Sequence, residues 1–208
     1  MKTIIKRLMI TTAILIAVSL SARADIYTFD SITAYTNSGY QSVASQMTME
    51  VVSSDTNSAV LNFSNAGPVV SSVAQIYFEY TGYTGSEYTV AAPTGWGFGE
   101  TPPYLPAGDT VGFYGDFYLT ANPPPSMNGI EAGESLTVTL SYDPYFDIIA
   151  ALDGGELRVG LHVVGIPDAE GLDQTYSESM VNIPEAASSS LILLCSVGSL
   201  FIRRFFRA

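Results

Sequence analysis

The stretch "ELRVGLHVVGI", residues 156–166, alternates apolar and polar side chains with a period of two. Successive side chains of an extended strand point to opposite faces, so this alternation is typical of a half-buried β-strand. Arg158 and His162 lie on its polar face. The residues of its apolar face are Leu157, Val159, Leu161 and Val163.

The same period recurs along the chain between residues 25 and 166. Turn-forming clusters rich in Gly, Pro, Asn and Asp separate the segments, and no long helical pattern intervenes. This predicts an all-β fold, an antiparallel β-sandwich of the jelly-roll or immunoglobulin-like kind, with a barrel as the alternative. The expected strands are "DIYTFDSITAY", "VASQMTMEV", "AVLNFSN", "SVAQIYFEY", "EYTVAA", "TVGFYGDFYL", "ESLTVTLSY" and the stretch quoted above.

One short helix is expected in "YDPYFDIIAALDGGE", residues 142–156. Asp143 would be its N-cap, Pro144 its first residue, and Gly154 or Gly155 its end. With that start, the core-facing residues would be Phe146, Ile149 and Ala150.

Charge is divided unevenly along the 208 residues, a length that suits one domain with appendages. Residues 25–183 hold 19 of the 20 acidic residues and one basic residue, Arg158, which gives this part a net charge of −18. Such a surface repels phosphate backbones and anionic headgroups, so we expect no nucleic-acid partner. The 13 Tyr and 10 Phe supply apolar area for a folded core.

The N-terminal residues 1–24 have a basic start, an apolar stretch from Leu8 to Leu20, and small residues at Ala22 and Ala24. This is the layout of a secretory signal peptide, and it predicts cleavage before Asp25. An uncleaved anchor helix is the alternative. The domain would then span residues 25–182.

The C-terminal residues 183–208 combine an apolar run with a basic end. Residues 186–202 carry no formal charge and, as a helix, would measure roughly 26 Å, the short limit for crossing a bilayer. The three arginines that follow would stay on the cytoplasmic side. These are Arg203, Arg204 and Arg207.

The tail "VNIPEAASSSLILLCSVGSLFIRRFFRA" resembles the PEP-CTERM sorting signal of bacterial exported proteins, in which a short motif precedes an apolar segment and an arginine cluster. Here the motif is Pro184-Glu185-Ala186, whose third residue departs from the family name. The resemblance implies processing by exosortase, a membrane protease-transpeptidase, and release or attachment at the cell surface. A plain single-span anchor is the alternative. The middle of the chain also resembles the globular regions that often precede such tails, which implies a secreted β-sandwich and brings no activity with it.

Catalytic chemistry finds little support in the sequence. His162 is the only histidine, and Cys195, the only cysteine, lies in the tail, so neither a cysteine nucleophile nor a zinc site is expected in the domain. No G-x-S-x-G motif accompanies His162. Pairs of carboxylates that could serve a glycosidase arise by chance among so many acids. We therefore expect a protein that is not an enzyme, with a secreted hydrolase as the second alternative.

Calcium is the one metal that the acidic residues could hold, and only weakly, because no cluster follows the EF-hand spacing. Solvated turn residues are the simpler interpretation. The clusters are Asp153 with Glu156, Asp143 with Asp147, and Asp168 with Glu170 and Asp173.

Three aromatic residues in "TGWGFGETPPY", residues 94–104, lie among glycines and prolines. Exposed rings in such a loop can stack on the apolar faces of sugars, whereas buried rings would close one end of the core. The residues are Trp96, Phe98 and Tyr104. The sequence thus predicts an exported structural or interaction protein of the cell envelope or extracellular matrix, with an exopolysaccharide-binding module as the first alternative.

Overall fold

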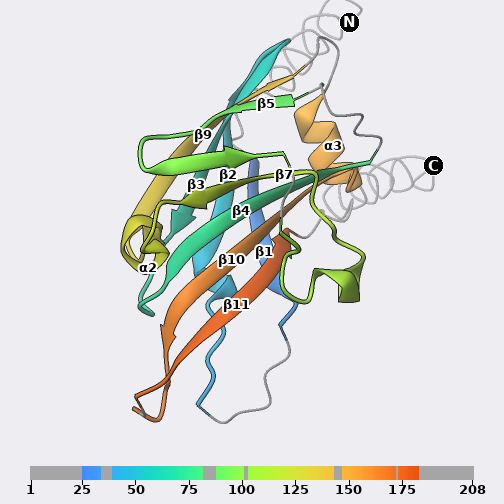
Figure 1. Ribbon diagram of the computed structural model, residues 1–208. Helices are drawn as coiled ribbons and strands as arrows, with labels where there is room; N and C mark the ends of the chain where they lie inside the picture. The colour runs from blue at the N-terminus through green and yellow to red at the C-terminus, as the bar shows by residue number, and fades with distance from the viewer. Residues whose placement is uncertain are drawn as a thin grey trace, which may run out of the picture.

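The computed structural model describes residues 25–33, 39–81, 88–100, 103–142, 147–171 and 173–182. Within these residues the alternating segments form antiparallel strands, joined by short helices and turns (Figure 1). The strands are β1 (Asp25–Ser31), β2 (Met47–Ser54), β3 (Ser58–Asn65), β4 (Ser72–Tyr80), β5 (Tyr88–Ala91), β6 (Trp96–Gly99), β7 (Phe117–Ala121), β8 (Ile130–Glu131), β9 (Glu134–Tyr142), β10 (Leu157–Pro167) and β11 (Thr175–Asn182). The helices are α2 (Pro125–Asn128) and α3 (Ile148–Gly154), with 3-10 turns η1 (Ala44–Gln46) and η2 (Gly108–Val111).

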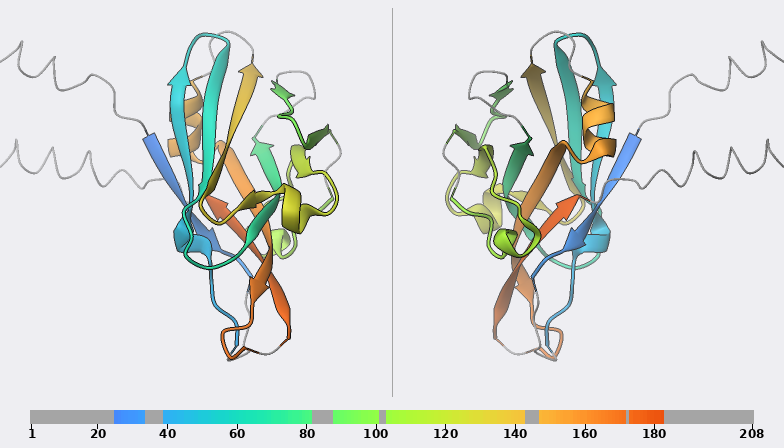
Figure 2. Two further views of the ribbon diagram at one scale, coloured as in Figure 1. Left: turned by 90° about the vertical axis from the view of Figure 1, so that its left-hand side faces the viewer. Right: turned by 90° about the vertical axis from the view of Figure 1, so that its right-hand side faces the viewer.

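One continuous sheet contains all of these strands, in the order β5-β9-β3-β2-β1-β11-β10-β4-β7-β6, with β8 attached to β4. The link between its halves is β1, which changes partner along its length. Residues 25–28 pair with β2, and residues 29–31 pair with β11. The sheet therefore bends round until its halves face each other, as a near-closed barrel (Figures 1 and 2).

The predicted all-β class and antiparallel pairing are confirmed. The two separate sheets of the predicted sandwich do not form, because all strands belong to one sheet. The physical reason is the shared strand β1, which carries hydrogen bonds from one half of the sheet to the other. A period of two indicates which residues face inward but is the same for a sandwich and a barrel. Local patterns therefore could not distinguish the two architectures.

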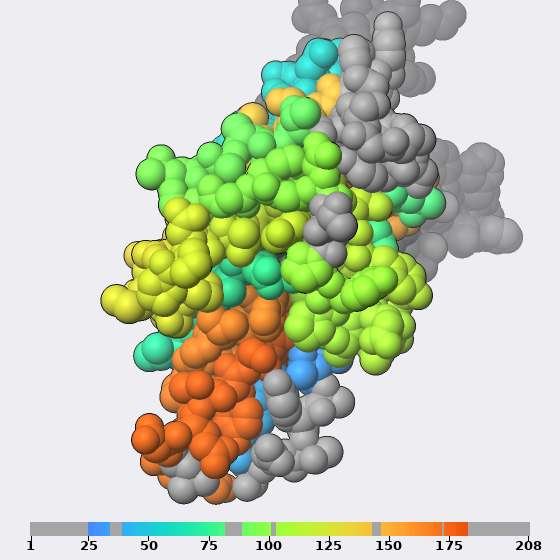
Figure 3. Space-filling view, in the orientation of Figure 1, coloured from blue at the N-terminus to red at the C-terminus, as the bar shows by residue number. Residues whose placement is uncertain are grey.

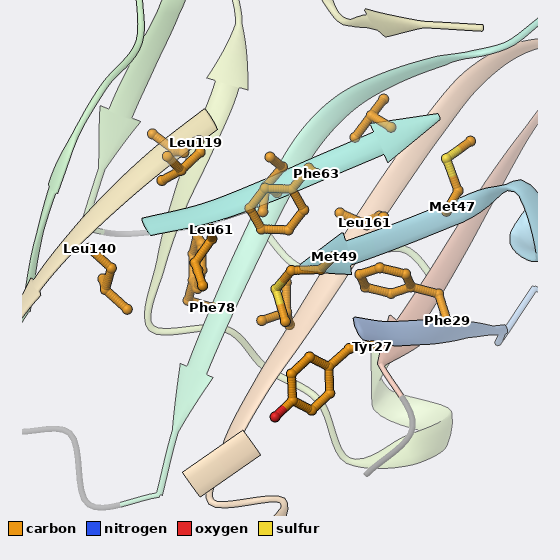
Figure 4. Packing of buried hydrophobic residues seen from close by; sticks show 14 of the residues in the cluster. Tyr27, Phe29, Met47, Met49, Leu61, Phe63, Phe78, Leu119, Leu140 and Leu161 are labelled. Atoms are coloured by element: carbon orange, nitrogen blue, oxygen red, sulfur yellow. The ribbon is translucent and has the colours of Figure 1, made fainter. Parts of the chain in front are cut away.

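Apolar side chains from both halves of the sheet meet in one core (Figure 4). The Phe78 ring of β4 stacks on Phe117 of β7 at a centroid distance of 4.9 Å and meets Phe63 of β3 edge-on at 6.3 Å. The apolar face predicted for residues 156–166 is buried as expected, each member at most 1% exposed. The alternation thus correctly predicts which residues of β10 face inward.

The short helix forms, but it begins later than predicted. Helix α3 starts at Ile148, and its N-cap is Asp147, whose side chain accepts a hydrogen bond from the Ala150 N–H at 3.1 Å. The chain leaves the helix through Gly155, in the left-handed region with a φ of 72°. Of the residues predicted to face the core, Ala150 is exposed, whereas Ile149 is partly buried and packs against the core. The buried residues are Ile148, Ala151 and Leu152, and the predicted N-cap Asp143 and Phe146 lie outside the described residues.

Strands β6, β8 and β11 were not predicted from the sequence. Glycine alternates with aromatic residues in β6, which made the segment resemble a loop. In β11, residues 178–182 are all buried, because both faces of this strand are covered, so no alternation is visible. Strand β7 begins only at Phe117, after η2 and a turn, whereas the sequence predicts a strand over residues 110–119.

Both terminal segments, residues 1–24 and 183–208, lie outside the described residues. The signal peptide, the motif Pro184-Glu185-Ala186, the apolar run 186–202 and the terminal arginines therefore stay predictions. None of the helices in the described part of the chain is both long and apolar enough to span a membrane.

Candidate ligand-binding groove

A long connection, residues 103–116, covers the outer face of β4 and β10 and forms a lobe at the right of Figure 3. Leu105 and Phe113 from this connection are 2% and 1% exposed, and they pack with Tyr77 of β4 and Val181 of β11 in a second apolar cluster. Gly160 of β10 makes the close approach feasible. A Cβ there would lie 2.8 Å from Leu105 Cδ2 and 3.0 Å from the Phe113 ring.

Arg158 fastens the connection to the sheet. Its Nε donates to Glu79 Oε2 at 2.6 Å, its Nη1 donates to the Val111 carbonyl at 3.1 Å, and its Nη2 donates to the Gly112 carbonyl and pairs with Glu79. The guanidinium also lies over the Phe113 ring, 5.4 Å from its centroid. The planar fork of arginine suits this set of acceptors, which the point charge of lysine would not match. The single basic residue of the domain is thus a structural clamp.

Two carboxylates complete the attachment. Glu79 Oε1 accepts a hydrogen bond from the Tyr114 N–H at 2.8 Å, and Asp116 Oδ2 accepts one from the Tyr80 N–H at 2.7 Å. Burial, followed by the charge of Glu79, raises the pKa of Asp116 above its usual range, against the effect of the Tyr80 hydrogen bond. These contacts hold the end of the connection, beside Tyr114, on the sheet.

A groove of about 450 Å³ opens on the outer side of this connection. Tyr104 and Tyr114 line it, and these residues are 80% and 56% exposed. Its other lining residues are Leu105, Pro106, Ala107 and Asp109. We call it the Tyr104–Tyr114 groove.

The floor of the groove is held in a defined conformation. Ala107 has a φ of 61°, in the left-handed region that residues other than glycine rarely adopt. Its carbonyl accepts hydrogen bonds from the Thr110 N–H at 3.1 Å and from Thr110 Oγ1 at 2.7 Å. Strain of this kind persists only where the surroundings fix the backbone. The groove therefore rests on an ordered turn.

The three aromatic residues singled out in the sequence do not share one surface. Trp96 is 9% exposed and belongs to the main core. Phe98, two residues further along β6, is 38% exposed and tilts against Phe117 at a centroid distance of 6.2 Å. Only Tyr104 lines the groove. Its partner Tyr114 was missed, although its place between Gly112 and Gly115 in "GFYGD" is a signal of the kind that drew attention to Trp96.

Two further titratable residues, the candidate His162 and the buried Glu178, are engaged in the fold. His162 Nδ1 lies 3.2 Å from Gln75 Oε1, and burial lowers the pKa of this histidine. Glu178, fully buried on β11, accepts hydrogen bonds from Ser42 Oγ at 2.6 Å and from the Val43 N–H at 2.7 Å. These contacts give both residues structural roles.

Three of the acidic residues considered for weak calcium binding hold hydrogen bonds within the fold, and Asp143 lies outside the described residues. Asp153 accepts a hydrogen bond from the Tyr27 hydroxyl at 2.9 Å, and Asp147 caps α3. Asp168 accepts bonds from the Tyr176 hydroxyl and the Glu170 N–H at 2.9 and 2.7 Å. In the part of the chain that the structure describes, no group of three or more His, Cys, Asp or Glu residues is arranged to hold a metal ion.

No known protein-family model matches the chain, and no curated protein matches it significantly. The interpretation of the groove therefore depends on its own geometry and charge.

An Arg158→Met variant is expected to loosen residues 104–116 while the sheet stays folded. The loss removes the ion pair with Glu79 and the donors to Val111 and Gly112, and should lower the free energy of unfolding by about 1–2 kcal/mol, between the values typical of exposed and buried pairs. Hydrogen–deuterium exchange should accelerate in this segment and stay slow in β3 and β9. The control is Arg158→Lys, which should give an intermediate effect. Unchanged exchange in both variants would show that Arg158 does not clamp the segment.

Proposed function

We propose that the chain is an exported interaction protein of the cell envelope or extracellular matrix, in which residues 25–182 present the Tyr104–Tyr114 groove and residues 183–208 act as a PEP-CTERM-like sorting tail. An exosortase-like membrane protease would be the processing partner. The tail would anchor the precursor through residues 186–202 before cleavage at Pro184-Glu185-Ala186, with Arg203, Arg204 and Arg207 in the cytoplasm.

One observation carries this proposal: the folded body fits between the two predicted processing positions. Strand β1 begins at Asp25, the first residue after the expected signal cleavage, and β11 ends at Asn182, two residues before Pro184. The two strands are paired neighbours, with Phe29 opposite Asn182. Removal of either terminal segment would leave every described strand whole.

The use of the polar residues favours binding over hydrolysis. The buried carboxylate of Glu178 and the largely buried one of Asp168 accept hydrogen bonds that hold loops to the sheet, and His162 lies against Gln75. General acid–base catalysis needs such groups to face a substrate. The groove offers two exposed tyrosines and one acidic side chain, Asp109, whereas a glycosidase needs a pair of carboxylates.

Intact-mass analysis of the protein isolated from its natural host tests the proposal. We expect a species that begins at Asp25 and ends near Pro184. Replacing both Ala22 and Ala24 by leucine should retain the signal peptide, because the cleavage site needs small residues. Replacing Pro184 and Glu185 by alanine should leave the tail attached and the protein in the membrane fraction.

Other masses would contradict separate parts of the proposal. A mature species that retains Arg207 would indicate a plain anchor. A product with both termini intact in the cytosol would contradict export itself.

A further inference from the structure

We propose that the Tyr104–Tyr114 groove binds a segment of an uncharged polysaccharide by stacking sugar rings on its two tyrosines. This inference names the ligand class and rests on the proposed role of the groove as the contact surface of an exported protein. It assigns Tyr104 and Tyr114 as stacking residues and Asp109 as a hydrogen-bond acceptor for sugar hydroxyls.

The two rings are exposed on a backbone that is held in place. Tyr104 directly precedes Leu105, and Tyr114 directly follows Phe113. Leu105 and Phe113 are buried against the sheet, and the Tyr114 N–H donates a hydrogen bond to Glu79. Tyrosine loses little side-chain entropy on binding, and its ring joins an apolar face to a polar hydroxyl. Two exposed aromatic side chains on a fixed backbone suit a ligand with alternating apolar faces and hydroxyl edges, which a sugar chain has.

Charge decides which sugars fit. Residues 25–182 contain one cation, Arg158, and its donors are committed to Glu79, Val111 and Gly112. An acidic polysaccharide would therefore find no available cation in this body, and it would meet Asp109 in the groove and a net charge of −18 around it. Like charges brought together in this way reduce affinity and select against the wrong partner. Uncharged chains avoid this cost.

The size of the groove favours a chain segment over a folded protein. Six residues line the groove. A stable protein–protein interface uses about 20–30 residues on each side. A volume of about 450 Å³ falls within the range of small-ligand clefts, about 300–1,000 Å³. Two or three sugar units are the occupant of matching scale.

Affinity electrophoresis of the full-length protein in detergent through gels that contain one polysaccharide each tests the inference. The probes are dextran and hydroxyethyl cellulose as uncharged chains, alginate as an acidic chain and chitosan as a cationic one. We expect retardation by at least one uncharged probe and none by alginate. Tyr104→Ala and Tyr114→Ala should each weaken that retardation about tenfold.

The matched control is Met127→Ala, which truncates a side chain that is 71% exposed and lies outside the groove, and it should leave retardation unchanged. Retardation by alginate alone, by chitosan alone, or by no probe would overturn the inference, as would wild-type retardation of both tyrosine variants. Chitosan alone would indicate general attraction to the acidic surface. These results would leave the proposed export and processing untouched, since the intact-mass experiment decides those independently.

Discussion

A Phe78→Ala variant is expected to lose about 3–5 kcal/mol of unfolding free energy, the range typical of a large aromatic residue removed from a core. Phe78 is fully buried on β4 and contacts the rings of Phe117 and Phe63. These neighbours come from different halves of the sheet, so the cavity would open where the two halves meet. Urea unfolding followed by circular dichroism should show a lower midpoint with an unchanged slope.

The control for this variant is Val70→Ala, which shortens a side chain that is 68% exposed. Its effect should stay within about 0.5 kcal/mol. Truncating Phe63 together with Phe78 should cost less than the sum of the two single changes, because the rings are in contact. A loss below about 1 kcal/mol for Phe78→Ala would contradict the packing of β4 against β3.

The inward faces of the strands could be predicted from the sequence because they depend on local periodicity. Leu157, Val159 and Leu161 are buried where the alternation placed them. The closure of the sheet could not be predicted, because it depends on β1 pairing both with the next strand, β2, and with β11 near the other end of the domain. The start of α3 could not be predicted either, because both Asp143 and Asp147 are favourable N-cap residues and the local sequence does not choose between them.

The candidate site was predicted in part. Tyr104 was identified from its position among prolines, and it lines the groove. Trp96 was interpreted in the same way, as a possible ligand contact, but β6 pairs with β7 and Trp96 lies in the core. The clamp formed by Arg158 could not be predicted from the sequence, because its acceptors lie in β4 and in a connection more than forty residues earlier in the chain.

Alkaline pH is expected to destabilise the protein through its buried tyrosines. Burial, followed by the charge of Tyr118, raises the pKa of Tyr77 well above its ordinary value. The pKa of Tyr40 is raised by burial and then by the hydrogen bond with Glu178. The pKa of Tyr142 is raised by burial and then by the charges of Asp55 and Asp147. The folded protein therefore retains these phenol protons at a pH where the unfolded chain has released them.

The sign follows from proton linkage. Below about pH 10, the ordinary pKa of tyrosine, both states hold the protons and the full stability is present. Above it the unfolded chain binds fewer protons than the folded one, so stability falls as pH rises toward the folded pKa values. A tyrosine that stays protonated only in the folded state lowers the unfolding free energy by at most about 1.4 kcal/mol for each further pH unit.

A Tyr77→Phe variant separates this effect from general alkaline damage. At neutral pH it loses the hydrogen bond to Gln75 Oε1, at 2.8 Å, and should be about 1 kcal/mol less stable. Between pH 10 and 12, however, its unfolding free energy should fall less steeply than that of the wild type, by about 1.4 kcal/mol per pH unit. Urea unfolding at a series of pH values, with phenolate absorbance recorded in parallel, measures both slopes. The control Met127→Ala alters no ionisable group and should keep the wild-type slope. If Tyr77→Phe also kept the wild-type slope, Tyr77 would ionise as readily in the folded state as in the unfolded chain.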